Sequence, residues 1–64
     1  MVYRFVIPDP GSPSRHETLA KEHRADGDAP AHGTILSDLT GVWVAFRTIE
    51  EDGDTVVYWR PSGS

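Results

Sequence analysis

The chain contains no cysteine, asparagine or glutamine, and only one lysine against five arginines. Without cysteine, neither a disulfide framework nor a thiolate-ligated zinc site can stabilise the fold. The bias in the other residues is typical of a GC-rich genome, so we expect a bacterial or phage source. No apolar run approaches the about 20 residues of a membrane-spanning helix, and residues 1–7 are too short for a signal peptide. The sequence therefore predicts a cytoplasmic protein without membrane contact.

Large apolar residues are also few. Val, Ile, Leu and Phe make up about a fifth of the 64 residues, just above the level typical of disordered chains, and two Trp and two Tyr add to them. A chain of this length forms one domain near the lower size limit for a core without disulfides or metal. We therefore expect a single, marginally stable domain over 1–64, with homodimerisation as one route to further burial.

The clearest structural pattern is a C-terminal β-hairpin over 42–60. Two runs rich in β-branched and aromatic residues, 42–49 and 55–59, flank the turn signal Asp52-Gly53. Asp-Gly favours a type I′ turn, because both central residues of that turn need positive φ. In a two-residue loop Glu51 pairs with Asp54, and regular alternation then assigns each hairpin residue to one of two faces.

This alternation predicts one apolar face and one mixed face. The apolar face, which we expect to line the core, comprises Val42, Val44, Phe46, Val57 and Trp59. The mixed face comprises Trp43, Ala45, Arg47, Ile49, Val56, Tyr58 and Arg60. A three-residue loop would instead shift the register by one residue and exchange the partners of one strand.

The first seven residues alternate as a half-buried strand does, and Pro8 ends the pattern because proline cannot donate to a ladder. Tyr3, Phe5 and Ile7 are the core candidates of this strand, since the opposite side carries the one charged residue, Arg4. The N-terminal segment therefore predicts one strand with a single buried face.

Residues 8–33 form a polar insertion in which Leu19 is the only large apolar side chain. Ser14 and Glu17 match a capping box, and Ser12 with Pro13 offers an alternative cap two residues before Ser14, so we expect one short helix over about 13–25. The apolar stripe of this helix is thin. A segment that orders only on binding a partner is therefore the alternative.

Residues 34–39 are ambiguous between a strand and a helical turn, and the glycines on either side favour a strand. Together these segments predict a small β-rich α+β domain. We expect an antiparallel sheet of three or four strands, curled like a compact SH3-like barrel or covered on one side by the helix. Residues 61–64 form a tail.

The best candidate for a binding site is the set Trp43, Arg47, Tyr58 and Arg60 on the mixed face, because arginine and aromatic residues anchor most protein interfaces. We therefore expect a non-catalytic interaction module that binds a protein partner or a second copy. The same side chains would also stack single-stranded bases, but a net charge of −4 argues against nucleic acid. The alternative without function is that Arg47 and Arg60 stack on Tyr58 and Trp43 within the molecule, or that the helix covers them.

No motif for catalysis or cofactor binding is present. The six glycines are scattered, which excludes a phosphate-binding loop, and no serine sits in a nucleophile elbow. In the expected helix His16 and His23 are two turns apart, roughly 10.5 Å, too far to share one metal ion, and His32 follows in the connector. The acidic cluster 50–54 lacks the ligand spacing of a calcium loop. We expect no enzyme activity, cofactor, metal or small-molecule substrate.

Overall fold

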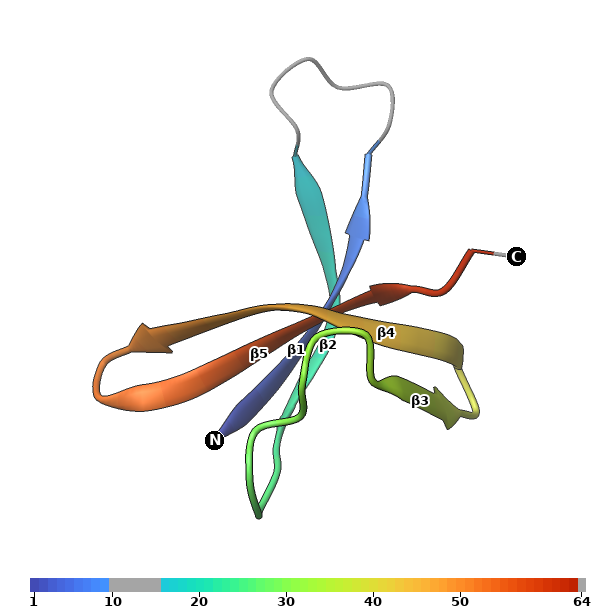
Figure 1. The fold of residues 1–64 in the computed structure, drawn as a ribbon. Helices are drawn as coiled ribbons and strands as arrows, with labels where there is room; N and C mark the ends of the chain where they lie inside the picture. The colour runs from blue at the N-terminus through green and yellow to red at the C-terminus, as the bar shows by residue number, and fades with distance from the viewer. Residues whose placement is uncertain (10–15, 64) are drawn as a thin grey trace.

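The computed structural model describes residues 1–9 and 16–63. Five strands are formed: β1 (Val2–Pro8), β2 (Glu17–Arg24), β3 (Ile35–Asp38), β4 (Gly41–Glu51) and β5 (Asp54–Pro61). They make one open sheet in the order β2-β1-β5-β4-β3, in which β1 and β5 run parallel and the other neighbours antiparallel. The sheet is strongly twisted, so that the β1–β2 hairpin crosses the β4–β5 hairpin steeply (Figure 1). The small β-rich fold agrees with the sequence, but the expected three or four antiparallel strands are wrong: the sheet has five strands, because residues 17–24 add one, and β1 is parallel to β5. A closed barrel is not formed.

The helix expected over about 13–25 is wrong for residues 17–24, which form strand β2 and pair antiparallel with β1. The start of the capping motif, at 13–15, lies outside the described residues. An isolated helix of this length is marginal in water and needs a wide apolar face to dock. The thin stripe offers little burial, while the edge of β1 offers a full ladder of backbone hydrogen bonds. Within the described residues no helix is long and apolar enough to span a membrane.

The C-terminal hairpin is confirmed at its turn. Asp52 and Gly53 have φ values of +52° and +78°, as a type I′ turn requires. Glu51 pairs with Asp54, and the expected partners continue along both strands as far as Arg47. The local turn signal therefore sets the register of the distal half of the hairpin.

Beyond Arg47 the register changes, because Phe46 is an extra residue in β4. Arg47 pairs with Tyr58, whereas Ala45, two positions earlier, pairs with the next residue of β5, Trp59. Where two residues of one strand lie opposite a single residue of its neighbour, the strand forms a β-bulge. Beyond the bulge, each side chain lies on the other face of the sheet from the one that regular alternation predicts. Ala45 and Trp43 therefore turn toward the core side of the sheet.

The core is an aromatic cluster on one face of the sheet. Its members are Phe5, Trp43, Ala45, Val57 and Trp59, all at most 5% exposed. The ring centroids of Phe5 and Trp43 are 5.0 Å apart in an edge-to-face arrangement, and Phe5 stacks on Trp59 at 5.9 Å. Trp59 Nε1 is buried without a hydrogen-bond partner among the described residues, a cost of about 1–3 kcal/mol for a chain with little burial to spare.

The predicted core set is therefore correct for β5 and wrong for β4. Val57 and Trp59 are buried as expected, but Val42 is 44% exposed, and Val44 and Phe46 are only half-buried on the opposite face. In β1 the candidates Phe5 and Tyr3 pack in or against the core, whereas Ile7 is exposed. A bulge at Phe5/Val6 places an extra residue, Ala20, in β2, and it disrupts the alternation of this hairpin too.

An ion pair joins the two edges of the sheet. Lys21 on β2 donates from Nζ to Asp38 on β3, and the same ammonium lies 4.7 Å from the ring centroid of Phe5. Asp38 also accepts hydrogen bonds from the backbone N–H and the hydroxyl of Thr40. The bond from Lys21 is the main reason that the pKa of Asp38 lies well below its ordinary range. The opening between β2 and β3 is thus bridged by side chains rather than by a backbone ladder.

We expect the free energy of unfolding to fall as the pH drops below about 4. Lys21 lowers the pKa of Asp38, and Arg24 with the Met1 ammonium lowers that of Asp54. A carboxylate with a depressed folded pKa contributes stability that is complete above its unfolded pKa of about 3.9 and is lost as the pH falls through the folded pKa. Urea unfolding midpoints measured between pH 7 and pH 2.5 test this.

The matched variants are Asp38→Asn and Asp28→Asn. Asp28 lies in the exposed connector and has no ion pair within the described residues, so its variant should keep the acid slope of the wild type. The Asp38 variant should be less stable at pH 7 and lose less on acidification. Parallel pH curves for all three proteins would contradict the assignment.

Candidate functional site

Trp43 is not part of a surface site. Its side chain is only 5% exposed, and the indole Nε1 donates to Thr40 Oγ1 at 3.1 Å, which ties the ring to the β3–β4 turn. Regular alternation predicts it beside Arg47, but the bulge at Phe46 separates the two residues onto opposite faces. Trp43 belongs to the core and is withdrawn from the candidate site.

The other three predicted residues do share one face, opposite the aromatic core, and Phe46 joins them. We call Phe46, Arg47, Tyr58 and Arg60 the outer-face cluster. The Arg47 guanidinium carbon lies 4.1 Å from the Tyr58 ring centroid and 5.1 Å from that of Phe46. Arg60 lies 5.3 Å from the Phe46 centroid, and the two aromatic rings meet at 6.3 Å and 70°. Arg47 therefore stacks on Tyr58 within the molecule, whereas Arg60 stacks on Phe46 and not on Trp43.

Arg4 of β1 extends this cluster across the parallel strand pair. Its Nε donates to Glu22 at 2.6 Å, and its Nη1 donates to Glu51 at 3.0 Å and to the Tyr58 hydroxyl at 2.7 Å. These bonds, that to Glu22 first, raise the pKa of Arg4 above its ordinary value. The arginine is therefore a fixed positive link that holds Tyr58 in place.

The remaining two arginines of the cluster differ in their partners. Arg47 donates from Nη2 to Glu17 at 2.9 Å. Arg60 is exposed and, among the arginines that the structure describes, is the one without a carboxylate partner. Its guanidinium is thus positioned over an aromatic ring while its hydrogen-bond donors remain open to a ligand.

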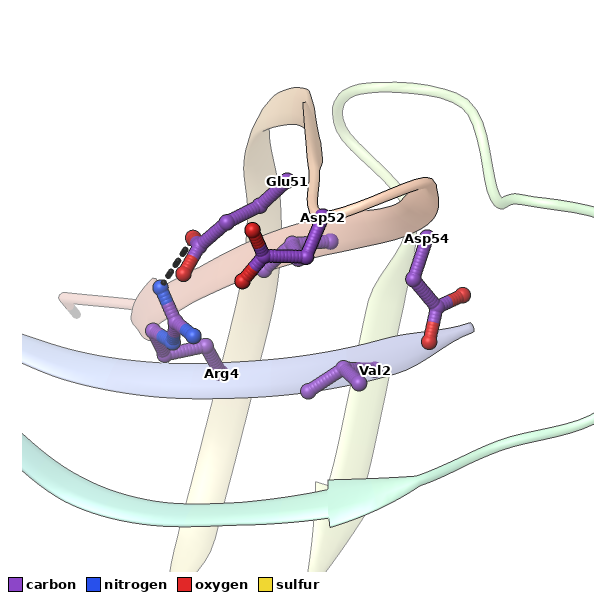
Figure 2. Close-up of a pocket in the computed structure, with 6 residues that line it drawn as sticks. Val2, Arg4, Glu51, Asp52 and Asp54 are labelled. Carbon is purple, nitrogen blue, oxygen red and sulfur yellow. Dashed lines mark hydrogen bonds and ion pairs between the residues drawn. The ribbon is translucent and has the colours of Figure 1, made fainter.

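A pocket of about 240 Å³ opens beside the cluster at the tip of the β4–β5 hairpin. It is lined by Val2, Arg4, Glu51, Asp52, Asp54 and Val56. Figure 2 shows Glu51 bonded to Arg4, with the Asp52 carboxylate close by and Asp54 at the far end. Asp54 pairs with Arg24 at 3.0 Å, so Asp52 is the carboxylate here without an ion pair in the described residues. The pocket has a negative character that disfavours anions.

The histidines have separate surroundings. The His23 ring lies 5.4 Å from that of Phe5, His32 Nε2 is 3.2 Å from the hydroxyl of Thr48, and His16 is exposed before β2. No group of three or more His, Cys, Asp or Glu residues in the described ranges is placed to hold a metal ion. No histidine contributes to the outer-face cluster.

Comparisons with protein-family models, with curated proteins and with solved structures find no match to this chain. The functional argument therefore depends on the geometry of the outer face. Sequence patterns identify Arg47, Tyr58 and Arg60 but miss Arg4 and Phe46. Arg4 is visible as the one charge in an apolar strand, whereas nothing in the sequence marks Phe46 as a bulge.

Proposed function

We propose that this protein is a small non-catalytic interaction module that binds a protein partner, or a second copy, through the outer-face cluster. Arg60 carries the proposal: its exposed guanidinium is held over Phe46 and has no carboxylate partner in the described part of the chain. A guanidinium that is already positioned loses less conformational freedom when it forms a bidentate bond. Such arginines, next to aromatic rings, are typical energetic centres of protein interfaces.

The chemistry of the cluster favours one kind of partner. Arg60 fits a carboxylate, and the half-buried rings of Phe46 and Tyr58 offer an apolar surface beside it. Val44 pairs with Arg60 across the strands and continues this apolar surface toward β3. A protein segment that presents an acidic residue next to an aliphatic or aromatic one meets both requirements.

Binding of single-stranded nucleic acid to the same face is the weaker proposal. Phosphate affinity comes from positive charges that the ligand can neutralise, and Arg4 and Arg47 are already neutralised by Glu22, Glu51 and Glu17. A phosphate at these positions would have to displace a carboxylate and then lie close to it. Aromatic rings that could stack on bases are present, but the electrostatic attraction that holds a nucleic-acid strand is weak.

The proposed surface can be tested by photo-crosslinking in cells of the source organism. A photoreactive phenylalanine analogue at position 46 should form adducts with a protein, whereas the same analogue at Thr48, an exposed site on the opposite face, should form few. Adducts are identified by mass spectrometry, and adducts of twice the chain mass report a second copy. Arg60→Ala in the position-46 protein should reduce the adduct yield about tenfold, the loss of one charge-assisted anchor.

The matched control is Arg24→Ala, which removes an exposed arginine of β2 and should leave the yield unchanged. Equal labelling from positions 46 and 48, or an Arg60 variant that labels like the wild type, would refute the surface. Titration of a labelled single strand at low and moderate salt covers the weaker proposal. We expect no salt-sensitive binding.

A further inference from the structure

The two edges of the sheet differ in their protection against pairing. β2 carries five titratable side chains in eight residues: Glu17, Lys21, Glu22, His23 and Arg24. Charges of this kind discourage another strand from adding to an edge. β3, with the sequence Ile-Leu-Ser-Asp, carries only Asp38, and Lys21 already holds that carboxylate. The edge of β3 is therefore the less protected one, because the ion pair with Lys21 involves only its last residue, Asp38.

The register shows which backbone groups β3 leaves open. Ala45 N–H donates to Thr34 O at 3.0 Å, and the ladder ends where Asp38 pairs with Gly41. Hydrogen-bonding direction alternates along a strand, so the N–H and C=O groups of Ile35 and Ser37 point away from β4. Within the described residues these groups have no backbone partner on that side. The open edge thus presents two residues ready for an antiparallel ladder.

Exposed apolar side chains gather at the same place. Ile35 is 57% exposed, Val42 44% and Leu39 fully so, and these are three of the five large apolar residues that the described chain exposes. All three belong to the β3–β4 hairpin. A group of exposed apolar residues next to an open strand edge is typical of an interaction site, or of an aggregation site if it is left uncovered.

We propose that β3 pairs antiparallel with β3 of a second copy around a two-fold axis at Leu36, forming one continuous sheet through both molecules. Ile35 then faces Ser37 of the second copy, and each such pair exchanges hydrogen bonds in both directions. This interface lies on the strand edge and does not depend on the proposed function of the outer-face cluster. It explains why β3 lacks the charges that β2 carries.

A second copy fits this edge better than an unrelated strand does. An antiparallel pair about a two-fold axis is self-complementary, so each copy supplies the same apolar side chains and the same open groups. No charge faces its own image, because Leu36 lies on the axis and Asp38, which is bound to Lys21, lies opposite Thr34 of the second copy. A four-residue edge and three side chains offer less than the about 800 Å² per partner of a stable dimer. The dimer should therefore be weak, with a Kd in the range of about 10–100 µM.

Sedimentation equilibrium of the purified protein between 5 and 500 µM tests this pairing. The wild-type mass should rise from 7.1 kDa toward about twice that value. Ser37→Pro removes the outward N–H and blocks the ladder, while the bonds to β4 use neighbouring residues. This variant should remain monomeric at 500 µM, and Ser37→Ala, the matched control, should associate like the wild type.

Ile35→Lys provides a second variant that leaves the ladder to β4 intact, because it places a charge on an exposed side chain of the edge. It should also remain monomeric. A wild-type protein that stays at 7.1 kDa up to 500 µM overturns the proposal, whether or not another protein's strand occupies the edge. A dimer that survives both variants but dissociates on Arg60→Ala also overturns it, and assigns self-association to the outer-face cluster instead.

Discussion

Replacing Trp43 with alanine should lower the free energy of unfolding by about 3–5 kcal/mol, the usual cost of removing a large buried aromatic side chain. Trp43 is 5% exposed, packs against Phe5 at 5.0 Å and donates a hydrogen bond to Thr40. Domains have about 0.05–0.15 kcal/mol of stability per residue, so this loss is comparable with the whole stability of a chain this small. We expect the variant to be largely unfolded at 25 °C by far-UV circular dichroism.

The control is the neighbouring Val42→Ala, because Val42 is 44% exposed on the outer face. It should change the free energy of unfolding by less than about 1 kcal/mol, as substitutions outside the core do. A Trp43 variant that keeps wild-type urea stability would show that the residue is on the surface, as regular alternation predicts. The face reversal at Phe46 would then be wrong.

Ala45→Glu should abolish folding, whereas Val44→Glu should be tolerated. Ala45 is 1% exposed within the aromatic core, and a carboxylate there would be buried without a partner, a cost of about 3–5 kcal/mol. Val44 lies on the outer face opposite Arg60, whose guanidinium has no carboxylate partner among the described residues and can receive the new charge. Urea unfolding at pH 7 compares the two variants with the wild type.

Regular alternation without the bulge predicts the opposite order, with Ala45 facing Arg60 and Val44 in the core. A stable Ala45→Glu protein together with an unfolded Val44→Glu protein would therefore refute the bulge directly. A third variant, Phe46→Ala, should cost only the contacts of a half-buried ring, because Phe46 lies outside the aromatic core. The three variants together map the position at which the strand changes face.

The part of the fold that the sequence predicts correctly is the part determined by local chemistry. Asp52 and Gly53 adopt positive φ values, which aspartate tolerates and glycine allows because it has no Cβ, and the register follows from the turn as far as Arg47. The bulge at Phe46 has no such signal. The energy of the bulge depends on how the whole of β4 twists around the core, which local residue patterns do not reveal. Regular alternation therefore predicts, wrongly, that Trp43 lies on the surface.

The N-terminal half shows a second limit on predicting the fold from the sequence. The pattern around Glu17 favours a helix locally, yet the same residues complete a ladder with β1. β1 also pairs with β5, and Arg4 donates a hydrogen bond to Tyr58, 54 positions further along the sequence. No turn motif in the sequence marks a parallel pairing between strands so far apart. The site is therefore predicted only where it lies on the C-terminal hairpin, at Arg47, Tyr58 and Arg60.

The order of the strands in the sheet also affects how the chain folds during its synthesis. β5 lies at the centre of the sheet between β1 and β4, although it is the last strand in the sequence (Figure 1). While the polypeptide is being synthesised, β1 can pair only with β2, and Phe5 lacks its stacking partner Trp59 until β5 has been made. Such distant pairings delay folding, since the entropy of closing the loop must be lost before any contact compensates. The sheet therefore stays incomplete until β5 has been synthesised and has inserted between β1 and β4.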